Sequence, residues 1–570
     1  MNVAREAAAL VSTLMARPWG QVSASIYETG RLVTLAPWLT GHRERIAYLL
    51  ARQLPDGSWG APDGYGLVPT LSATEALRTA GGATTEPART PDRTPDRTPD
   101  TTPDRTPGSG ADSRVDGVAV LREAAGRGLR ALRTWLAAPV ELPDMPAVEL
   151  IVPSLVALIN AHQVGAPLPL PTGMDFSRVE RIRHVVRSGV ALPEKLLHAL
   201  EVAGPVAGHA RSVRPTAIGT IGASPAATAA WLGSVLPGGH PARETPQGAT
   251  SQQRRGTPGA TALLDAPAAP EGVSPDGEMV RAHLEAVVSR FGGPVPVGLP
   301  ITVFERGWVL SWLIRAGVPV TAPPEMVADL RAAIGPAGTP AGPGLPADAD
   351  TTSVALYALS LVGQPHDPAS LLAFDAGTHF CTWQGEDGFS ISVNAHVLDA
   401  FGAYSARRPD RARAYAPVVR RLSALLADRQ QPDGSWDDRW HASPYYATLS
   451  CVLALGAYGG PGREEVIRRA RAWVLSTQRA DGSWGRWEGT TEETAYALQT
   501  LLAGAGELDE WREQAIGRGY RYLHTVADIS EYPPLWHDKD LYTPIAVVRS
   551  AVLGALHLCE TKIKTGQIRT

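Results

Sequence analysis

The chain has 570 residues, enough for two or three domains with sizeable hydrophobic cores. Its formal net charge of −4 gives no reason to expect nucleic acid or an anionic membrane as a partner. The three cysteines, Cys381, Cys451 and Cys559, share no CxxC spacing, which argues against a disulfide framework or a zinc cluster and favours a reducing, cytoplasmic setting.

The first twenty residues carry a charge at Glu6 and lack the continuous apolar core of a signal peptide. The sequence contains no run of about 18 uncharged apolar residues, the length that a spanning helix needs. We therefore expect a soluble cytoplasmic protein without stable membrane insertion.

One heptapeptide occurs three times, as QLPDGSW at residues 53–59, QQPDGSW at 430–436 and QRADGSW at 478–484. The last two copies begin about 48 residues apart, a period typical of stacked helical hairpins. Gly after Asp permits a tight turn, while the Gln amide and the Trp indole can tie that turn to a neighbouring helix.

Two segments interrupt the globular pattern, residues 86–115 and 236–275. Both are rich in Pro, Thr, Arg and Gly, which build neither a regular helix nor a core. We interpret them as solvated loops inserted into a folded scaffold.

Elsewhere the apolar residues recur with a helical period, for example at 303–316, 351–361, 393–401 and 490–502. Alternating strand patterns are sparse. The sequence predicts an all-α protein of paired helices, and the repeats towards both ends favour two barrels of similar design.

An acidic run, Asp348-Ala349-Asp350-Thr351-Thr352, opens the helix predicted at 351–361. Taken alone it is typical of an ordinary acidic helix start. Beside the repeats it has a second interpretation.

Together these features resemble the class II terpene cyclases, especially the bacterial diterpene-type enzymes and plant copalyl diphosphate synthases. The repeats look like the QW motifs of that family, and residues 348–352 look like its acid motif in the DxDTT variant. Further matching segments lie at residues 25–29, 149–155, 198–201, 224–229, 299–305 and 535–544. The resemblance implies two α/α-barrels: a β domain formed by residues 1–20 and 291–570, which carries the acid motif, and a γ domain at 21–290 containing the two inserts.

The resemblance also implies an activity, the protonation-initiated cyclisation of a linear prenyl diphosphate to a bicyclic diphosphate that keeps its diphosphate. Geranylgeranyl diphosphate is the favoured substrate, and farnesyl diphosphate, giving drimenyl diphosphate, is the alternative. A protein prenyltransferase-like enzyme and a non-catalytic α/α-barrel binding protein stay open as other classes. A downstream phosphatase or class I terpene synthase would use the product.

By resemblance Asp350 is the general acid and Asp348 its partner. A buried carboxyl beside a second one can have its pKa raised by roughly 3–5 units, which would keep the donor protonated. Thr351 replaces the third Asp of the usual motif and adds no negative charge. Asn394 is a candidate to orient the acid or the substrate, although a structural amide is equally open, and His396 is expected to be a packing residue.

His198 matches the His of a His–Asn dyad that positions the terminating water in plant ent-copalyl synthases. Val297 stands where the Asn would be, so we expect a different base, stereochemistry or skeleton. His198 as base and His198 as a structural residue both stay open.

Aromatic side chains can stabilise a carbocation by cation–π attraction. The candidates for the cavity wall are Trp308, Trp312, Trp383, Phe389, Tyr445, Tyr446 and Tyr496. For the diphosphate we expect Mg²⁺, with Glu149 as an acidic ligand, and contacts from Lys539, Tyr542 and Arg549.

Overall fold

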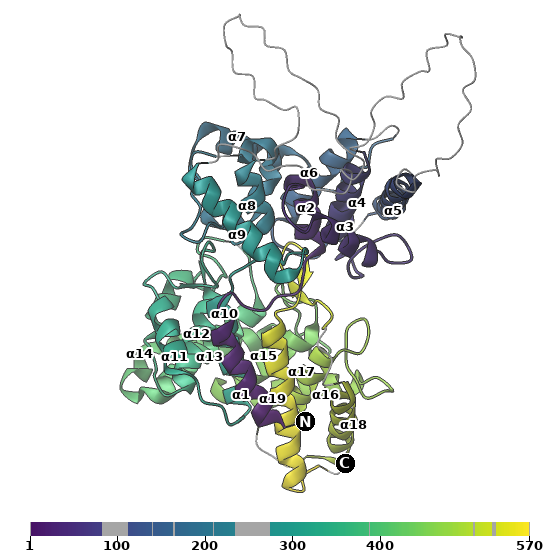
Figure 1. Ribbon diagram of the computed structural model, residues 1–570. Coiled ribbons are helices and arrows are strands. Elements are labelled where there is room, and N and C mark those ends of the chain that lie inside the picture. The colour runs from purple at the N-terminus through teal and green to yellow at the C-terminus, as the bar shows by residue number, and fades with distance from the viewer. Residues whose placement is uncertain are drawn as a thin grey trace, which may run out of the picture.

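The computed structural model describes residues 2–82, 112–139, 141–162, 166–208, 210–233, 274–386, 388–504, 508–526 and 532–568. Within these ranges the chain is almost wholly helical, and its only strands form two short antiparallel pairs (Figure 1). The predicted all-α fold is confirmed. The predicted inserts lie outside the described residues except at their ends, where α5 begins at Asp112 and α9 at Pro275.

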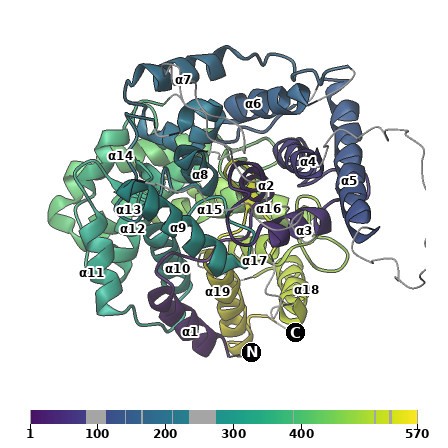
Figure 2. The ribbon, with the colours of Figure 1, turned by 45° about the horizontal axis from the view of Figure 1, so that its top comes forward.

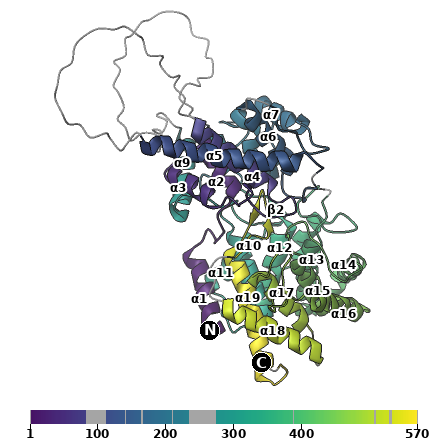
Figure 3. The ribbon, with the colours of Figure 1, turned by 90° about the vertical axis from the view of Figure 1, so that its right-hand side faces the viewer.

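The helices form two barrels stacked on each other (Figures 1 and 3). In the upper barrel α2, α4, α6, η1 and α8 pack in a closed ring, and α3, α5, α7 and α9 lie outside it. Figure 2 shows α2, α4 and α8 near the centre and α5 and α7 at the rim. The bounds are Ile26–Leu35 (α2), His42–Ala51 (α3), Leu67–Gly82 (α4), Asp112–Leu136 (α5), Val148–Ala161 (α6), Ser177–Ser188 (α7), Glu194–Ala207 (the 3₁₀ helix η1), Pro225–Leu232 (α8) and Pro275–Phe291 (α9).

In the lower barrel the inner ring is formed by α10, α12, α13, α15, α17 and α19, and most outer helices pack against two of its members. The inner helices are Thr302–Arg315 (α10), Ala349–Leu361 (α12), Ile391–Arg407 (α13), Pro444–Tyr458 (α15), Thr491–Leu502 (α17) and Ile545–Lys564 (α19). The outer helices are Val3–Ala16 (α1), Pro324–Ala333 (α11), Pro368–Phe374 (the 3₁₀ helix η2), Pro409–Asp428 (α14), Arg463–Ser476 (α16) and Glu510–Val526 (α18).

Helix α1 packs against α10 and α19 of the lower barrel, although the whole upper barrel follows it in sequence. Both ends of the chain accordingly lie at the lower barrel (Figure 1). The domain boundaries at residues 20 and 290 stay a prediction. The contacts of α1 with the lower barrel are the observation that bears on the first boundary.

Each copy of the heptapeptide forms the turn between an outer helix and the next inner helix. The indole nitrogen donates to a backbone carbonyl ten residues earlier, and the Gln amide donates both to the Gly of its own turn and to a neighbouring helix. The indole contacts are Trp59 to Leu49 (2.7 Å), Trp436 to Leu426 (2.9 Å) and Trp484 to Val474 (2.7 Å). The amide contacts outside the turn are Gln53 to Ala124, Gln430 to Val466 and Gln478 to Ala515 (2.9 Å each). The predicted tie between turn and helix is confirmed.

Two short hairpins lie close to the junction of the barrels. The first, β1 (Thr339–Pro340) and β2 (Ala347–Asp348), leads directly into α12. The second, β3 (Trp536–His537) and β4 (Leu541–Tyr542), lies between α18 and α19 in sequence, and its yellow strands lie between the two barrels (Figure 3). The residues in its turn contact the upper barrel directly, as described below.

Candidate active site

A cavity of about 480 Å³ lies between the two barrels. Its lining includes the start of α12 from the lower barrel, the β3–β4 hairpin, and the starts of α6, α7 and η1 from the upper barrel. Asp348, Asp350 and Thr351 are therefore on the same cavity as His198 and Glu149, although these residues are far apart in sequence.

Asp348 is the N-cap of α12. Its Oδ1 accepts from the backbone N–H of Thr351 (2.6 Å) and its Oδ2 from the Thr351 hydroxyl (2.8 Å). Burial raises the pKa of Asp348 to about 7, against the lowering effect of the Thr351 hydrogen bonds and with a further rise from Asp350. The hydroxyl of Thr351 thus donates to Asp348 and not to Asp350, the predicted general acid.

Asp350 contacts a histidine on the neighbouring inner helix. His396 on α13 places Nδ1 2.5 Å from Oδ1 of Asp350, and its Nε2 lies 3.3 Å from the hydroxyl of Ser450. That hydroxyl donates its one hydrogen to the carbonyl of Tyr446 (3.0 Å), so towards His396 it accepts. Nε2 therefore carries a hydrogen, and one proton lies between Nδ1 and the carboxyl of Asp350.

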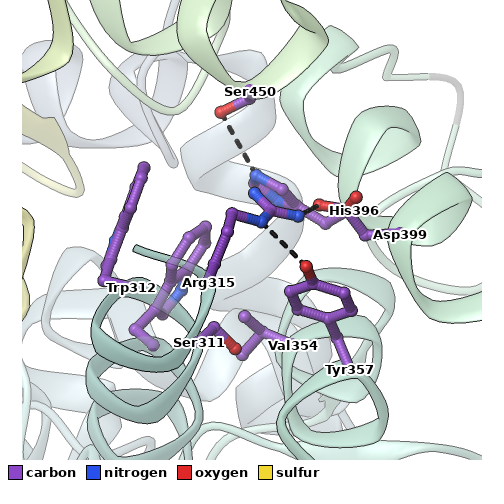
Figure 4. A pocket seen from close by; sticks show the side chains of 9 residues that line it. Ser311, Trp312, Arg315, Val354, Tyr357, His396, Asp399 and Ser450 are labelled. Atoms are coloured by element: carbon purple, nitrogen blue, oxygen red, sulfur yellow. Dashed lines mark hydrogen bonds and ion pairs between the residues drawn. The ribbon is translucent and has the colours of Figure 1, made fainter. Parts of the chain in front are cut away.

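A small polar cavity of about 10 Å³, close to the size of one water, lies behind His396 (Figure 4). Arg315 lies there, donating to the hydroxyl of Tyr357 (2.8 Å) and to Oδ2 of Asp399. Oδ1 of Asp399 and Oγ of Ser311, which are buried beside this cavity, find no hydrogen-bond partner among the described residues. His396 thus rests on a polar layer inside the lower barrel.

On α13 the structure favours the structural alternative for Asn394 and departs from the packing role expected for His396. The side chain of Asn394 bonds to the backbone N–H and carbonyl of Phe380 (2.9 and 3.0 Å) and to the carbonyl of Ser390 (2.8 Å), and is fully buried. It makes no hydrogen bond to the acid motif, whereas His396, expected to pack, does. One sequence signal could have identified His396 as a functional residue: it is a titratable side chain on a helix that has apolar residues on all sides.

His198 is held at both ring nitrogens. Nδ1 lies 2.6 Å from the carbonyl of Gly222, and Nε2 lies 2.9 Å from Oδ1 of Asp538. Burial lowers the pKa of His198, but the carboxylates of Asp538 and Glu28 raise it, and the net pKa lies above its ordinary value. For Asp538 burial acts in the opposite direction and raises the pKa. The positive charges of His198 and Lys539 lower it further than burial raises it, so the pKa of Asp538 lies below its usual range. The two groups form a charged pair on the cavity wall.

Lys539 does not serve as a free phosphate ligand. Its fully buried ammonium pairs with Glu28 and donates to Glu201 (3.0 Å), Ser224 (2.8 Å) and the carbonyl of His198 (2.7 Å). The lysine therefore ties the β3–β4 hairpin to the upper barrel. Of its predicted companions, Tyr542 lines the cavity, whereas Arg549 on α19 pairs with Glu6 of α1 (3.9 Å) and does not.

The expectation of Mg²⁺ at Glu149 is wrong. The described residues contain no group of three or more His, Cys, Asp or Glu side chains that could hold a metal ion, and Glu149 pairs with Arg178 (3.5 Å). Sequence reasoning missed three cations on the cavity wall, Arg178 of α7, Lys195 of η1 and Arg439. Nothing in the pattern around them distinguishes these three from ordinary surface charges.

Of the predicted wall aromatics, only Trp383 is among the described residues that line the cavity. Trp308 instead packs edge-on against His396, with ring centroids 4.6 Å apart. The others lie in the barrel core or against other partners: Trp312 stacks on Trp308, Phe389 contacts Arg429, Tyr445 contacts Trp473, Tyr446 stacks on His441, and Tyr496 donates to Glu492. Three further aromatic side chains on the cavity wall, Phe304, Trp440 and Trp536, were missed by the prediction. Tyr542, which was predicted for the diphosphate, also lines the cavity.

Known proteins resemble both the sequence and the fold. Residues 386–543 match the family model of the squalene-hopene cyclase C-terminal domain. The ent-copalyl diphosphate synthase of Streptomyces sp. (strain KO-3988) is 40% identical over 96% of this chain and 94% of its own length. The labda-7,13-dienyl diphosphate synthase of Streptomyces clavuligerus is 37% identical over 98% and 93%. The solved ent-copalyl diphosphate synthase from Streptomyces platensis aligns with a TM-score of 0.81 at 40% identity, covering 98% of this chain and 100% of that one. Among the described residues, no helix has the length and apolarity that crossing a bilayer requires.

Proposed function

The chain belongs to the bacterial class II diterpene cyclases, and we propose on that premise that it cyclises geranylgeranyl diphosphate to a bicyclic diphosphate by protonation, with the diphosphate retained. The observation that carries the proposal is a single cavity whose wall holds both Asp350 and the cations Arg178, Lys195 and Arg439. A linear substrate with an alkene at one end and a diphosphate at the other needs both kinds of group in one cavity.

Asp350 is the group that delivers the proton. A new C–H bond forms at the terminal alkene, the π electrons leave a tertiary cation, and the remaining alkenes close the rings. The proton that leaves is carried by Oδ2, and the hydrogen between Nδ1 of His396 and Oδ1 stays in place, so the carboxylate that forms is stabilised at the moment of transfer. The contact supports a role for His396 in positioning the acid.

Aromatic side chains on the cavity wall suit a carbocation. Phe304, Trp383, Trp440 and Trp536 present aromatic rings, each worth about 0.5–2 kcal/mol of cation–π attraction to a cation that they contact. Pairs of these rings pack edge to face, at 5.9 Å for Phe304 with Trp536 and 5.1 Å for Trp383 with Trp440, which fixes their orientation.

The three cations supply diphosphate contacts from both barrels. Arg178 and Lys195 come from the upper barrel, and Arg439 comes from the lower one. Arg439 also lies 3.1 Å from Asp144, which holds its guanidinium at the junction. Guanidinium groups match phosphate oxygens with paired donors, so a diphosphate held between the two barrels keeps the hydrocarbon chain in the cavity with Asp350.

Family membership favours this function over the protein prenyltransferase-like and non-catalytic alternatives. The relatives carry diterpene diphosphate names, which favours the C20 substrate over farnesyl diphosphate. We also infer a cytoplasmic location, with the product consumed by a phosphatase or a class I terpene synthase.

The test is incubation of the purified chain with geranylgeranyl diphosphate and, separately, farnesyl diphosphate, followed by phosphatase treatment and mass spectrometry. We expect a bicyclic alcohol from the C20 substrate and none from Asp350→Asn. The matched control is Asp410→Asn, an exposed carboxyl on α14 that pairs with Arg408. Absence of a cyclised product from the wild-type chain with the C20 substrate would overturn the proposal.

A further inference from the structure

The reaction needs an acceptor for one proton, because the acid adds a proton and the hydrocarbon part of the product is neutral. His198 is the residue that resemblance offers for this task, and its geometry argues against it. Nδ1 faces the carbonyl of Gly222, which only accepts, and Nε2 faces the carboxylate of Asp538. With both ring nitrogens directed at acceptors in a charged pair, the imidazolium keeps no lone pair for another proton.

The partner of His198 has the free oxygen that the imidazolium lacks. Oδ1 of Asp538 accepts from His198 (2.9 Å) and from the backbone N–H of Lys539 (2.7 Å). Oδ2 makes no hydrogen bond to any residue that the structure describes, and the side chain keeps 20% of its surface exposed on the cavity wall. The carboxylate is thus fixed through one oxygen and open through the other.

The partners of Asp538 separate it from the other carboxylates on the cavity wall. Asp348 and Asp350 form the acid motif, and Asp350 is held by His396. Glu149 is paired with Arg178, and both Asp144 and Glu386 are paired with Arg439. Asp538 instead contacts His198 of η1, and Val297 lines the same cavity.

Tyr542 connects this location to the acid. Burial raises the pKa of its phenol, and Asp538, Asp350 and Asp348 raise it further, in that order. The phenol is therefore within electrostatic reach of both carboxylate positions, as expected if one substrate spans the distance between them.

The neighbouring His537 also lines the cavity and is the rival base, but its free ring nitrogen is buried. Its Nδ1 lies 2.6 Å from the carbonyl of Arg439, and its Nε2 is buried without a partner among the described residues. Basicity does not decide between candidates, because a proton next to a carbocation is strongly acidic and any well-placed base can take it. Access decides, and Asp538 has it.

We propose that Oδ2 of Asp538 accepts the proton that leaves the bicyclic carbocation and so determines which double bond forms. The C–H bond next to the cationic carbon breaks, its electron pair becomes the new C=C bond, and the proton forms an O–H bond with Asp538. Together with the proton from Asp350 the hydrocarbon gains one proton and loses one, a net isomerisation that needs no further reactant. The inference rests on the proposed function, since it requires a carbocation in the cavity.

The experiment compares wild type, Asp538→Asn, Asp538→Glu and the surface control Asp410→Asn with geranylgeranyl diphosphate in H₂¹⁸O, with circular dichroism melts to check folding. We expect Asp538→Asn to consume substrate within about tenfold of the wild-type kcat/KM. Its olefin should be largely replaced by an ¹⁸O-labelled alcohol diphosphate, because water adds to a cation that finds no base. Asp538→Glu keeps a carboxylate for His198 but moves it by one methylene, so it should still form olefins with a changed double-bond ratio.

Wild-type olefin in the wild-type proportion from both variants would overturn the inference. So would a folded Asp538→Asn that consumes no substrate, since that result assigns Asp538 to binding. If Asp538→Asn fails to fold, the product ratio of Asp538→Glu decides alone. A wild-type chain that forms no cyclic diphosphate refutes the proposed function itself, an outcome visible before any variant is assayed.

Discussion

Nδ1 of His396 lies 2.5 Å from Oδ1 of Asp350, across the contact between two inner helices of the lower barrel. Ser450 fixes which ring nitrogen carries hydrogen, because its own hydrogen is committed to the carbonyl of Tyr446. The acid is therefore held by an imidazole, and the roles of the two residues can be separated by substitution.

Asp350→Asn should lower kcat by about 10³-fold or more, because an amide has no proton acidic enough for an alkene. KM should change little, since Asp350 is not one of the proposed diphosphate contacts. Steady-state kinetics with product detection by mass spectrometry measure both. A variant with more than a tenth of the wild-type kcat would remove Asp350 from the role of acid.

His396→Phe should lower kcat by about 10²-fold with KM unchanged, because Oδ1 of Asp350 then loses its partner in a buried site. His396→Asn can still present a polar group to that oxygen and should recover part of the loss. The measurement is the ratio of the two kcat values at matched thermal stability. Equal values for the Phe and Asn variants would show that the imidazole only fills space.

Lys195→Ala should raise KM by about tenfold and leave the product unchanged, since the variant loses one of the three cations proposed to contact the diphosphate. The matched control is Arg187→Ala, an exposed cation at the end of α7. Raising the salt concentration should raise the wild-type KM more than that of Lys195→Ala. A lowered kcat at constant KM would contradict this assignment.

Glu305→Gln should flatten the pH dependence of stability. Burial raises the pKa of Glu305 from 4.5 to about 7, so the folded state holds its proton more tightly than the unfolded state. Stability from this group is fully present below pH 4.5 and is lost as the pH rises through 7, by about 3 kcal/mol in all. Thermal melts of wild type and variant from pH 4 to 8 measure the difference, and parallel curves would show that Glu305 does not titrate in this range.

Lys539→Met should destabilise the fold by about 3–5 kcal/mol, because Glu28 and Glu201 then stay buried without their cation. Chemical denaturation reports the change. The earlier expectation of a phosphate contact makes a different prediction, a raised KM at unchanged stability, so the two measurements together distinguish the roles.

The amino-acid sequence by itself determined the all-α fold, the three heptapeptide turns and the location of the acid motif. In each turn the decisive contacts are local: Asp433 accepts from Ser435 two residues on, and the indole of Trp436 reaches a carbonyl only ten residues back. Asp348 likewise caps the helix that it opens through Thr351, three residues later. Interactions at such short separation follow from residue types and spacing alone.

The tertiary structure decided everything that depends on distant partners. His396 meets Asp350 across 46 residues, and His198 meets Asp538 across 340. No spacing rule predicts which of many buried side chains face one another once two barrels close, because that follows from the packing of whole helices. The same reason explains three differences from the sequence-based expectations. Lys539 is a buried ion-pair partner, and Asn394 bonds to backbone groups. Phe304, Trp440 and Trp536 line the cavity in place of most of the predicted aromatic residues.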